Sequence, residues 1–212
     1  MGFPEVRRAT KRAASPKGAG ISALITFSWT ARLWDSVSCW FAEEPRYTVE
    51  TVLKGVEIRR YAMAARVETH VAISDLVRAH DQGFRRLAAY FLGNNTTSSS
   101  GPERLPMAVP VLGAPSRLGG HRFTIIVPDG REVTALPTPL DARVRLREFG
   151  EQLVAVVGLR GSFRDDRARR DDLLTTLADL RLSIGGVPAF AAYGPPGATS
   201  LVHHNEVWVP IR

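Results

Sequence analysis

The sequence predicts an α+β protein in which a twisted antiparallel sheet or distorted β-barrel is flanked by two helices. Stretches that alternate apolar and polar residues, typical of half-buried strands, are interrupted twice by segments with helical spacing. The second half of the chain also resembles the first: VRLREF at 144–149 follows VEIRRY at 56–61 after 88 positions. Neither half can bury both its sheet and its helix alone. We therefore expect an internal duplication, with strand-helix-strand units at about 45–136 and 137–212.

The elements of the first unit follow in order from Pro45. Alternation predicts strands from Tyr47, over 56–61 and over 65–71. Ser74 is a suitable N-cap for a helix through about Leu92, because its hydroxyl can accept a hydrogen bond from the first turn. Gly93 is a suitable stop for that helix. Further strands are expected over 105–112 and 121–127.

The second unit repeats this order. Strands are expected over 144–149 and from Val154 to Gly161, and a helix over about 165–182. Leucines recur on one face of that helix, which is typical of a helix packed on a sheet. Two prolines at 137 and 139 mark the junction between the units. The unit closes with strand-like segments at 187–193 and 205–211.

The segment before Pro45 differs in composition from the rest. The net charge of the chain is +7, and residues 1–20 contribute +4 of it through five basic residues against Glu5. We expect 1–20 to be a disordered basic tail, so the charge does not indicate nucleic-acid binding. Residues 21–44 have the spacing of an amphipathic helix. That helix could pack on the domain, contact a membrane surface through 1–41, or belong to a signal for export. We expect a cytoplasmic protein, with peripheral membrane association or export as the alternatives.

The sequence offers little catalytic machinery. Cys39 is its one cysteine, which excludes an intrachain disulfide and a zinc site built from several cysteines. It contains neither a nucleotide-binding glycine motif nor a nucleophile elbow. The acidic pairs at 165–166 and 171–172 stand among arginines at a helix start, where carboxylates favour the helix dipole. The sequence therefore favours a binding protein over an enzyme.

Five motifs in order resemble a known family. They are YTVE at 47–50 with VEIRRY, the helix ending in Gly93-Asn94, LPMAVPV at 105–111, LPTP at 136–139, and NEVW at 205–208. In this order they are similar to SOUL/heme-binding proteins over about 45–211. The resemblance implies that heme b or a related porphyrin binds in an apolar groove between the first helix and the loop at 193–202. One departure is Ala108, where the family usually has threonine.

The first helix supplies most of the expected site. Leu76, His80, Phe84, Leu87 and Phe91 fall on one stripe of it. His80 is the candidate iron ligand, and the alternative is a histidine at a boundary that is satisfied by a carbonyl or water.

Two further residues complete the expected site. Some family members have a histidine at the position of Arg60. Here Arg59 or Arg60 could pair with a porphyrin propionate, or either could stay solvated on the strand. Tyr193 begins the second wall of the groove.

The resemblance implies a tetrapyrrole ligand and a role as carrier, buffer or sensor. Two alternatives stay open. One is a heme-dependent enzyme acting on peroxide or a small nitrogenous substrate. The other is a small-molecule or protein-interaction module that no longer binds porphyrin.

Overall fold

The computed structural model describes residues 42–98, 101–128, 130–159, 166–194 and 205–212. The predicted tail at 1–20 and nearly all of the segment at 21–44 lie outside these ranges. The first part of the chain forms β1 (Tyr47–Leu53), β2 (Val56–Tyr61), β3 (Ala64–Val71), α2 (Leu76–Phe91), β4 (Asn95–Thr96), β5 (Val111–Pro115) and β6 (His121–Ile126). The second part forms the short helix η2 (Val133–Ala135), β7 (Thr138–Pro139), β8 (Val144–Phe149), β9 (Gln152–Leu159), α3 (Asp166–Asp179), β10 (Ala189–Ala192) and β11 (Asn205–Ile211).

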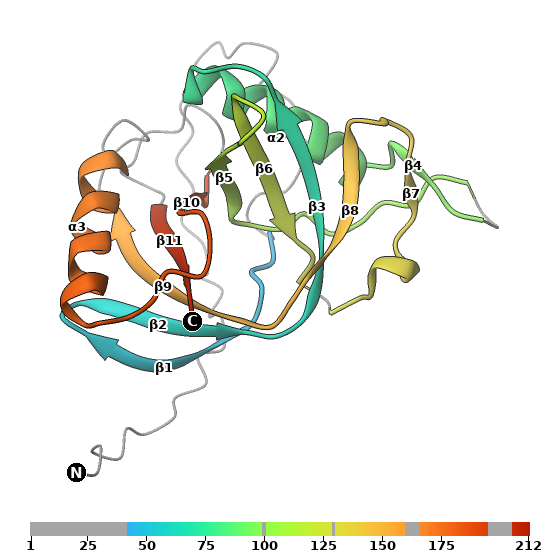
Figure 1. Ribbon diagram of the computed structural model, residues 1–212. Helices are drawn as coiled ribbons and strands as arrows, with labels where there is room; N and C mark the ends of the chain where they lie inside the picture. Colours follow the sequence, from blue (N-terminus) through green and yellow to red (C-terminus); the bar gives the residue numbers. More distant parts are fainter. Residues whose placement is uncertain (1–41, 99–100, 129, 160–165, 195–204) are drawn as a thin grey trace, which may run out of the picture.

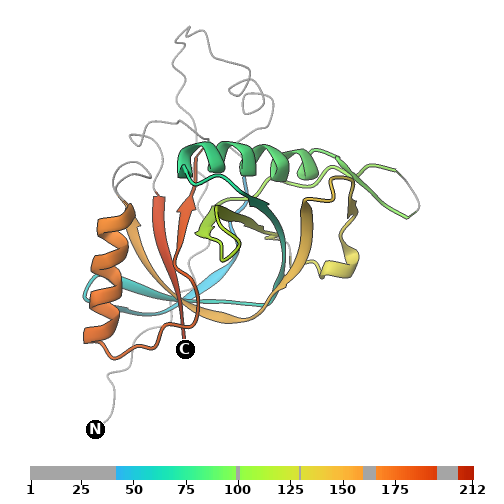
Figure 2. The same cartoon turned by 45° about the horizontal axis from the view of Figure 1, so that its top comes forward.

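Nine of the described strands form one antiparallel sheet in the order β1-β2-β9-β11-β10-β5-β6-β3-β8, and β4 pairs separately with β7. The sheet curls, with α2 and α3 on its outside (Figures 1 and 2). The α+β class with two flanking helices is therefore confirmed. The distorted barrel is wrong for the described strands, because β1 and β8 end the sheet instead of pairing with each other.

The strand order has an internal symmetry. If β2, β3, β5 and β6 are matched in turn to β8, β9, β10 and β11, the order from β2 to β8 reads the same from either end. The matched strands β2 and β8 begin at residues 56 and 144, and β3 and β9 begin at 64 and 152. Both pairs are thus separated by the 88 positions found in the sequence. The helices follow the same pattern, since α2 packs on β3 and β6 while α3 packs on β9 and β11.

Helix α2 begins one residue later than expected. Asp75, and not Ser74, is the N-cap, and its carboxylate accepts a hydrogen bond of 2.8 Å from the backbone N–H of Arg78. The helix ends before Gly93, whose φ of 106° favours glycine. At its centre a Cβ on Gly83 would lie 2.4 Å from a ring carbon of Phe123 on β6. Glycine at this position therefore lets α2 lie directly on the sheet.

Helix α3 covers the other half of the outer surface. Leu173 and Leu177 are buried against Val207, Val209 and Ile58 of the strands beneath it. The expected strand at 105–112 is shorter than expected and shifted, because β5 begins only at Val111, after two prolines that cannot donate a backbone hydrogen bond. In contrast, β11 has the expected bounds. Within the described residues, neither helix is long and apolar enough to cross a membrane.

The concave side of the sheet carries a third apolar cluster, which we call the inner face. It consists of Tyr61, Leu112, Ile126, Phe149, Val154, Val156, Ala191 and Trp208. The rings of Tyr61 on β2 and Phe149 on β8 lie 6.3 Å apart, although these strands stand near opposite ends of the strand order. The curl of the sheet thus brings the two halves of the chain together on this face.

Candidate functional site

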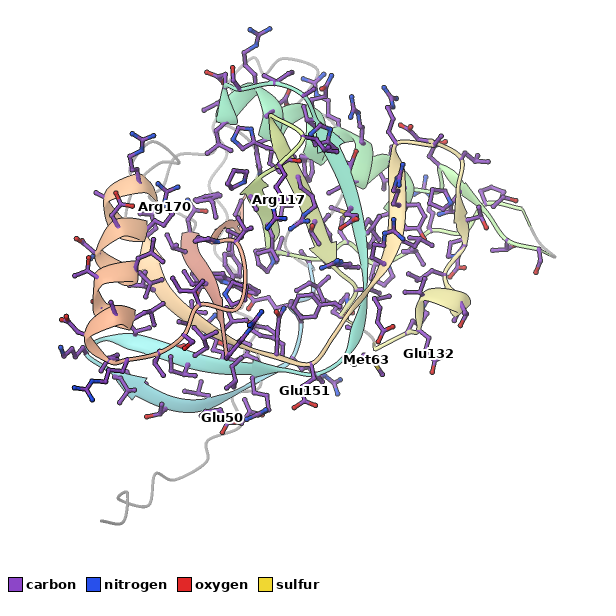
Figure 3. All side chains as sticks on the ribbon, in the orientation of Figure 1. Glu50, Met63, Arg117, Glu132, Glu151 and Arg170 are labelled. Carbon is purple, nitrogen blue, oxygen red and sulfur yellow. The ribbon has the colours of Figure 1, made fainter. Side chains whose placement is uncertain are left out.

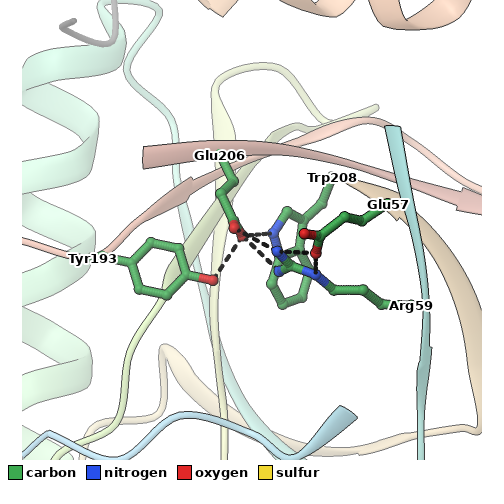
Figure 4. A network of polar contacts seen from close by, with 5 residues as sticks. All are labelled: Glu57, Arg59, Tyr193, Glu206 and Trp208. Carbon is green, nitrogen blue, oxygen red and sulfur yellow. Dashed lines mark hydrogen bonds and ion pairs between the residues drawn. The ribbon is translucent and has the colours of Figure 1, made fainter. Parts of the chain in front are cut away.

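A buried network of polar side chains lies on the inner face (Figure 4). The guanidinium of Arg59 on β2 donates two hydrogen bonds to the carboxylate of Glu206 on β11, at 3.0 and 2.8 Å. Both residues are buried. One oxygen of the same carboxylate also accepts hydrogen bonds of 2.7 Å from the Tyr193 hydroxyl and from the indole N–H of Trp208. The network therefore joins a strand of the first half to two segments of the second.

The network holds Glu206 as an anion. Burial alone would raise the pKa of this carboxyl, but the hydrogen bonds and charge of Arg59, with those from Trp208 and Tyr193, lower the pKa below its ordinary value. Burial and the charge of Glu206 raise the pKa of the Tyr193 hydroxyl, so that group stays a donor. Because this carboxylate accepts four hydrogen bonds, two of them from a cation, its charge is compensated and its position is fixed. It is not poised to exchange a proton at neutral pH.

Aromatic rings enclose this ion pair. The guanidinium carbon of Arg59 lies 4.4 Å from the ring centre of Tyr47, a cation–π contact. The rings of Tyr61 and Trp208 lie 4.8 Å apart. Arg59 also donates a hydrogen bond of 2.8 Å to Glu57. The ion pair is thus shielded from water on several sides, which strengthens its electrostatic interactions.

A cavity of about 220 Å³ opens beside the network. Trp208 contributes to both, because its ring lines the cavity while its N–H is held by Glu206. Leu112 and Phe149 add apolar residues to its wall, and two arginines, Arg66 and Arg122, also line it. The segment at 185–187 forms part of the rim, fixed by a hydrogen bond of 2.7 Å from the Gly185 N–H to the Pro210 carbonyl. This is a small site with apolar walls and cationic groups.

The stripe expected on the first helix lies on the opposite face of the sheet. Phe84, Leu87 and Phe91 are buried in the core beneath α2, and Leu76 is half-buried at its edge. His80 is 1% exposed, and its ring centre is 5.6 Å from that of Phe123. Burial lowers the pKa of His80 to about 4. The described residues include no group of three His, Cys, Asp or Glu arranged to hold a metal ion.

The other two residues expected at the porphyrin site, Arg60 and Tyr193, lie away from α2. Arg60 is exposed and forms ion pairs with Glu50 and Glu151, at 2.8 and 3.0 Å. Glu50 and Glu151 are labelled near the lower margin of Figure 3. Tyr193 lies on the inner face, in the polar network. The structure thus does not bring Arg60 and Tyr193 together with the α2 stripe. Most of the expected loop at 193–202 lies outside the described residues.

Sequence reasoning named Tyr193 but missed that Arg59, Glu206 and Trp208 come together with it. Arg59 was considered only beside Arg60 as a partner for a propionate, and Glu206 and Trp208 were noted only as part of the NEVW motif. A signal for them existed, since residues two apart on a strand share a face. Arg59 therefore faces the same way as the fully buried Tyr61, and Glu206 the same way as Trp208.

Comparisons with known proteins give a family and a fold. A family model described as SOUL heme-binding protein matches residues 42–210. No curated protein matches the chain. A solved hydrolase encoded by lin2189 from Listeria innocua is similar with a TM-score of 0.54 and 11% identity, over 77% of this chain and 94% of that one. EcmrR in its DNA complex is similar with a TM-score of 0.52 and 9% identity, over 74% of this chain and 57% of that one. At such identities these two likenesses concern the fold alone.

Proposed function

The chain belongs to the SOUL heme-binding protein family, and we propose from this membership that it binds heme or a related tetrapyrrole as a carrier, buffer or sensor. The observation that carries the proposal is the family match over 42–210, which spans both helices and all of the described sheet except Ile211 at the end of β11. The matching strand order of the two halves supports a second inference, that the fold arose by internal duplication.

Iron ligation by His80 does not fit the packing of α2. A neutral imidazole is the form that binds iron, and the low pKa of His80 provides it. The ring, however, lies between the helix and the sheet with 1% exposure. A porphyrin could reach it only if α2 separated from β6. We therefore propose that binding depends on apolar contacts with the ring and on polar contacts with the propionates.

We propose that the ring lies against α2, as the resemblance implies, and first contacts its exposed margin. Leu76 is half-buried there, and its neighbour Val77 is 42% exposed. The deeper members of the stripe, Phe84, Leu87 and Phe91, are closed against the sheet. They can contact a ring only after the helix moves. The margin is therefore the part of the expected site that a ligand can reach without rearrangement.

Iron-free protoporphyrin IX tests this mode of binding. If axial ligation contributes little, the iron-free ring and hemin bind with dissociation constants within about threefold of each other, a difference below 1 kcal/mol. Quenching of tryptophan fluorescence measures both affinities. Saturable binding of hemin without binding of the iron-free ring would show that iron ligation is required.

A negative charge placed at the exposed margin of α2 tests whether the porphyrin binds there. We expect Leu76→Glu to weaken protoporphyrin binding about tenfold, because a carboxylate would have to be desolvated against the ring. Val52→Glu is the matched control, since Val52 is 57% exposed on β1 at the far edge of the sheet. Equal affinity of the two variants would contradict a site beside α2.

A further inference from the structure

The cavity on the inner face is of a size for one small molecule. A cavity of about 150 Å³ in a protein core can hold benzene, and pockets for drug-sized ligands measure about 300–1,000 Å³. At about 220 Å³ the cavity suits a single ring with one substituent and is too small to enclose a porphyrin. Its apolar wall includes two aromatic rings, those of Phe149 and Trp208.

Three arginines gather at this cavity and its border. Arg66 on β3 and Arg122 on β6 line it, and Arg147 on β8 is the backbone partner of Arg66 in the β3–β8 ladder. One carboxylate, Glu68, contacts two of them, at 3.5 Å from the Nε of Arg66 and 3.6 Å from the Nε of Arg147. Three cations near one anion leave an excess of positive charge.

The pKa of Arg66 reflects its burial and these charged neighbours. Burial lowers its pKa, and the charges of Arg122 and Arg147 lower it further, while Glu68 acts in the opposite direction. The Nε of Arg66 is buried and lacks a well-oriented hydrogen bond. A second anion in the cavity would satisfy this donor and relieve the repulsion between the arginines.

We propose that the inner-face cavity binds a compact organic anion, a molecule with one aromatic or aliphatic ring and a carboxylate. The carboxylate is held by Arg66 and Arg122, and the ring lies among Leu112, Phe149 and Trp208. The network around Glu206 keeps Trp208 in place as a wall of this site. The site lies on the face opposite the α2 stripe, so it is separate from the proposed tetrapyrrole site.

A charge series on the full-length protein tests this site. Benzoate, neutral benzamide and cationic benzylamine share one ring and differ in charge. We expect benzoate to shift the NMR signal of the Trp208 indole N–H saturably and to bind at least about tenfold more tightly than the other two. Equal or tighter binding of benzylamine, or no saturable shift with benzoate, would overturn the proposal.

Arginine variants assign the anion contacts. Arg122→Met should weaken benzoate binding at least about tenfold. Because Arg122 is exposed, the variant is expected to fold. Arg169→Met is the matched control, since Arg169 is an exposed arginine on α3, and it should bind as the wild type does. Unchanged binding in Arg122→Met and in Arg66→Met would overturn the site.

This test is independent of the tetrapyrrole proposal. Arg122→Met should bind hemin as the wild type does. A wild-type protein that binds benzoate but no tetrapyrrole would refute only the proposed function. The reverse result would refute only the inner-face site.

Discussion

Replacing Glu206 by glutamine is expected to lower the free energy of unfolding by about 3–5 kcal/mol, because it removes the buried counter-charge of Arg59 and leaves only the partly exposed Glu57 beside it. The carboxylate accepts two hydrogen bonds from Arg59 and one each from Tyr193 and Trp208. A neutral amide cannot offset the charge, and its N–H₂ group would face other donors. Urea unfolding at pH 7.5 measures the loss.

Two further variants compare the stability contributed by the buried Arg59–Glu206 ion pair with that of an exposed ion pair. Glu151→Gln removes an exposed partner of Arg60 and should cost about 1 kcal/mol or less. Combining Arg59→Met with Glu206→Leu removes both charges, and we expect it to recover much of the stability lost in the single variant. If Glu206→Gln cost no more than Glu151→Gln, the network would not hold the two halves together.

The buried pair also contributes to acid sensitivity. The pKa of Glu206 is lower in the folded protein than in the unfolded chain. Its contribution is therefore complete above the unfolded pKa and is lost as the pH falls through the lowered, native pKa.

The second large expected effect is the dependence of stability on pH that His80 causes. The pKa of His80 is about 4 in the folded protein, because the ring is buried, against about 6.5 for a histidine in an unfolded chain. Between these values the unfolded chain takes up a proton and the folded protein does not, so stability falls as the pH falls from 6.5 to 4. The loss from this one group should reach about 3 kcal/mol. Urea unfolding at several pH values from 7.5 to 4.5 follows it.

A variant without the imidazole isolates this contribution. His80→Leu should flatten the decline between pH 6.5 and 4.5 relative to the wild type. Leu87→Met, a substitution of a buried neighbour that does not titrate, should shift the whole curve by a constant amount. A decline as steep in His80→Leu as in the wild type would show that the ring is not held neutral in the core.

The fold was largely predictable because its strands alternate regularly. The pattern at Val56–Tyr61 and its repeat at Val144–Phe149 gave two strands with their observed bounds. The start of α2 differed by one residue, because Ser74 and Asp75 are both good caps and only the backbone geometry distinguishes them. Whether the sheet closes into a barrel could not be predicted, because the alternation of apolar and polar residues does not show whether the two edge strands pair with each other.

The site was less predictable, for a physical reason. Periodicity shows that a helix has an apolar face but not whether a sheet or a ligand covers it. The stripe from Leu76 to Phe91 was found, and its deeper members are used by the core. The polar network depends on β2 and β11, which are 147 positions apart at Arg59 and Glu206. Only the strand order brings such residues together.

An absorbance titration of the full-length protein with hemin tests tetrapyrrole binding most directly. We expect the Soret band to shift and the shift to saturate near one hemin per chain, with the same end point in His80→Leu. A band that only grows in proportion to added hemin, with no saturation, would contradict tetrapyrrole binding by this protein.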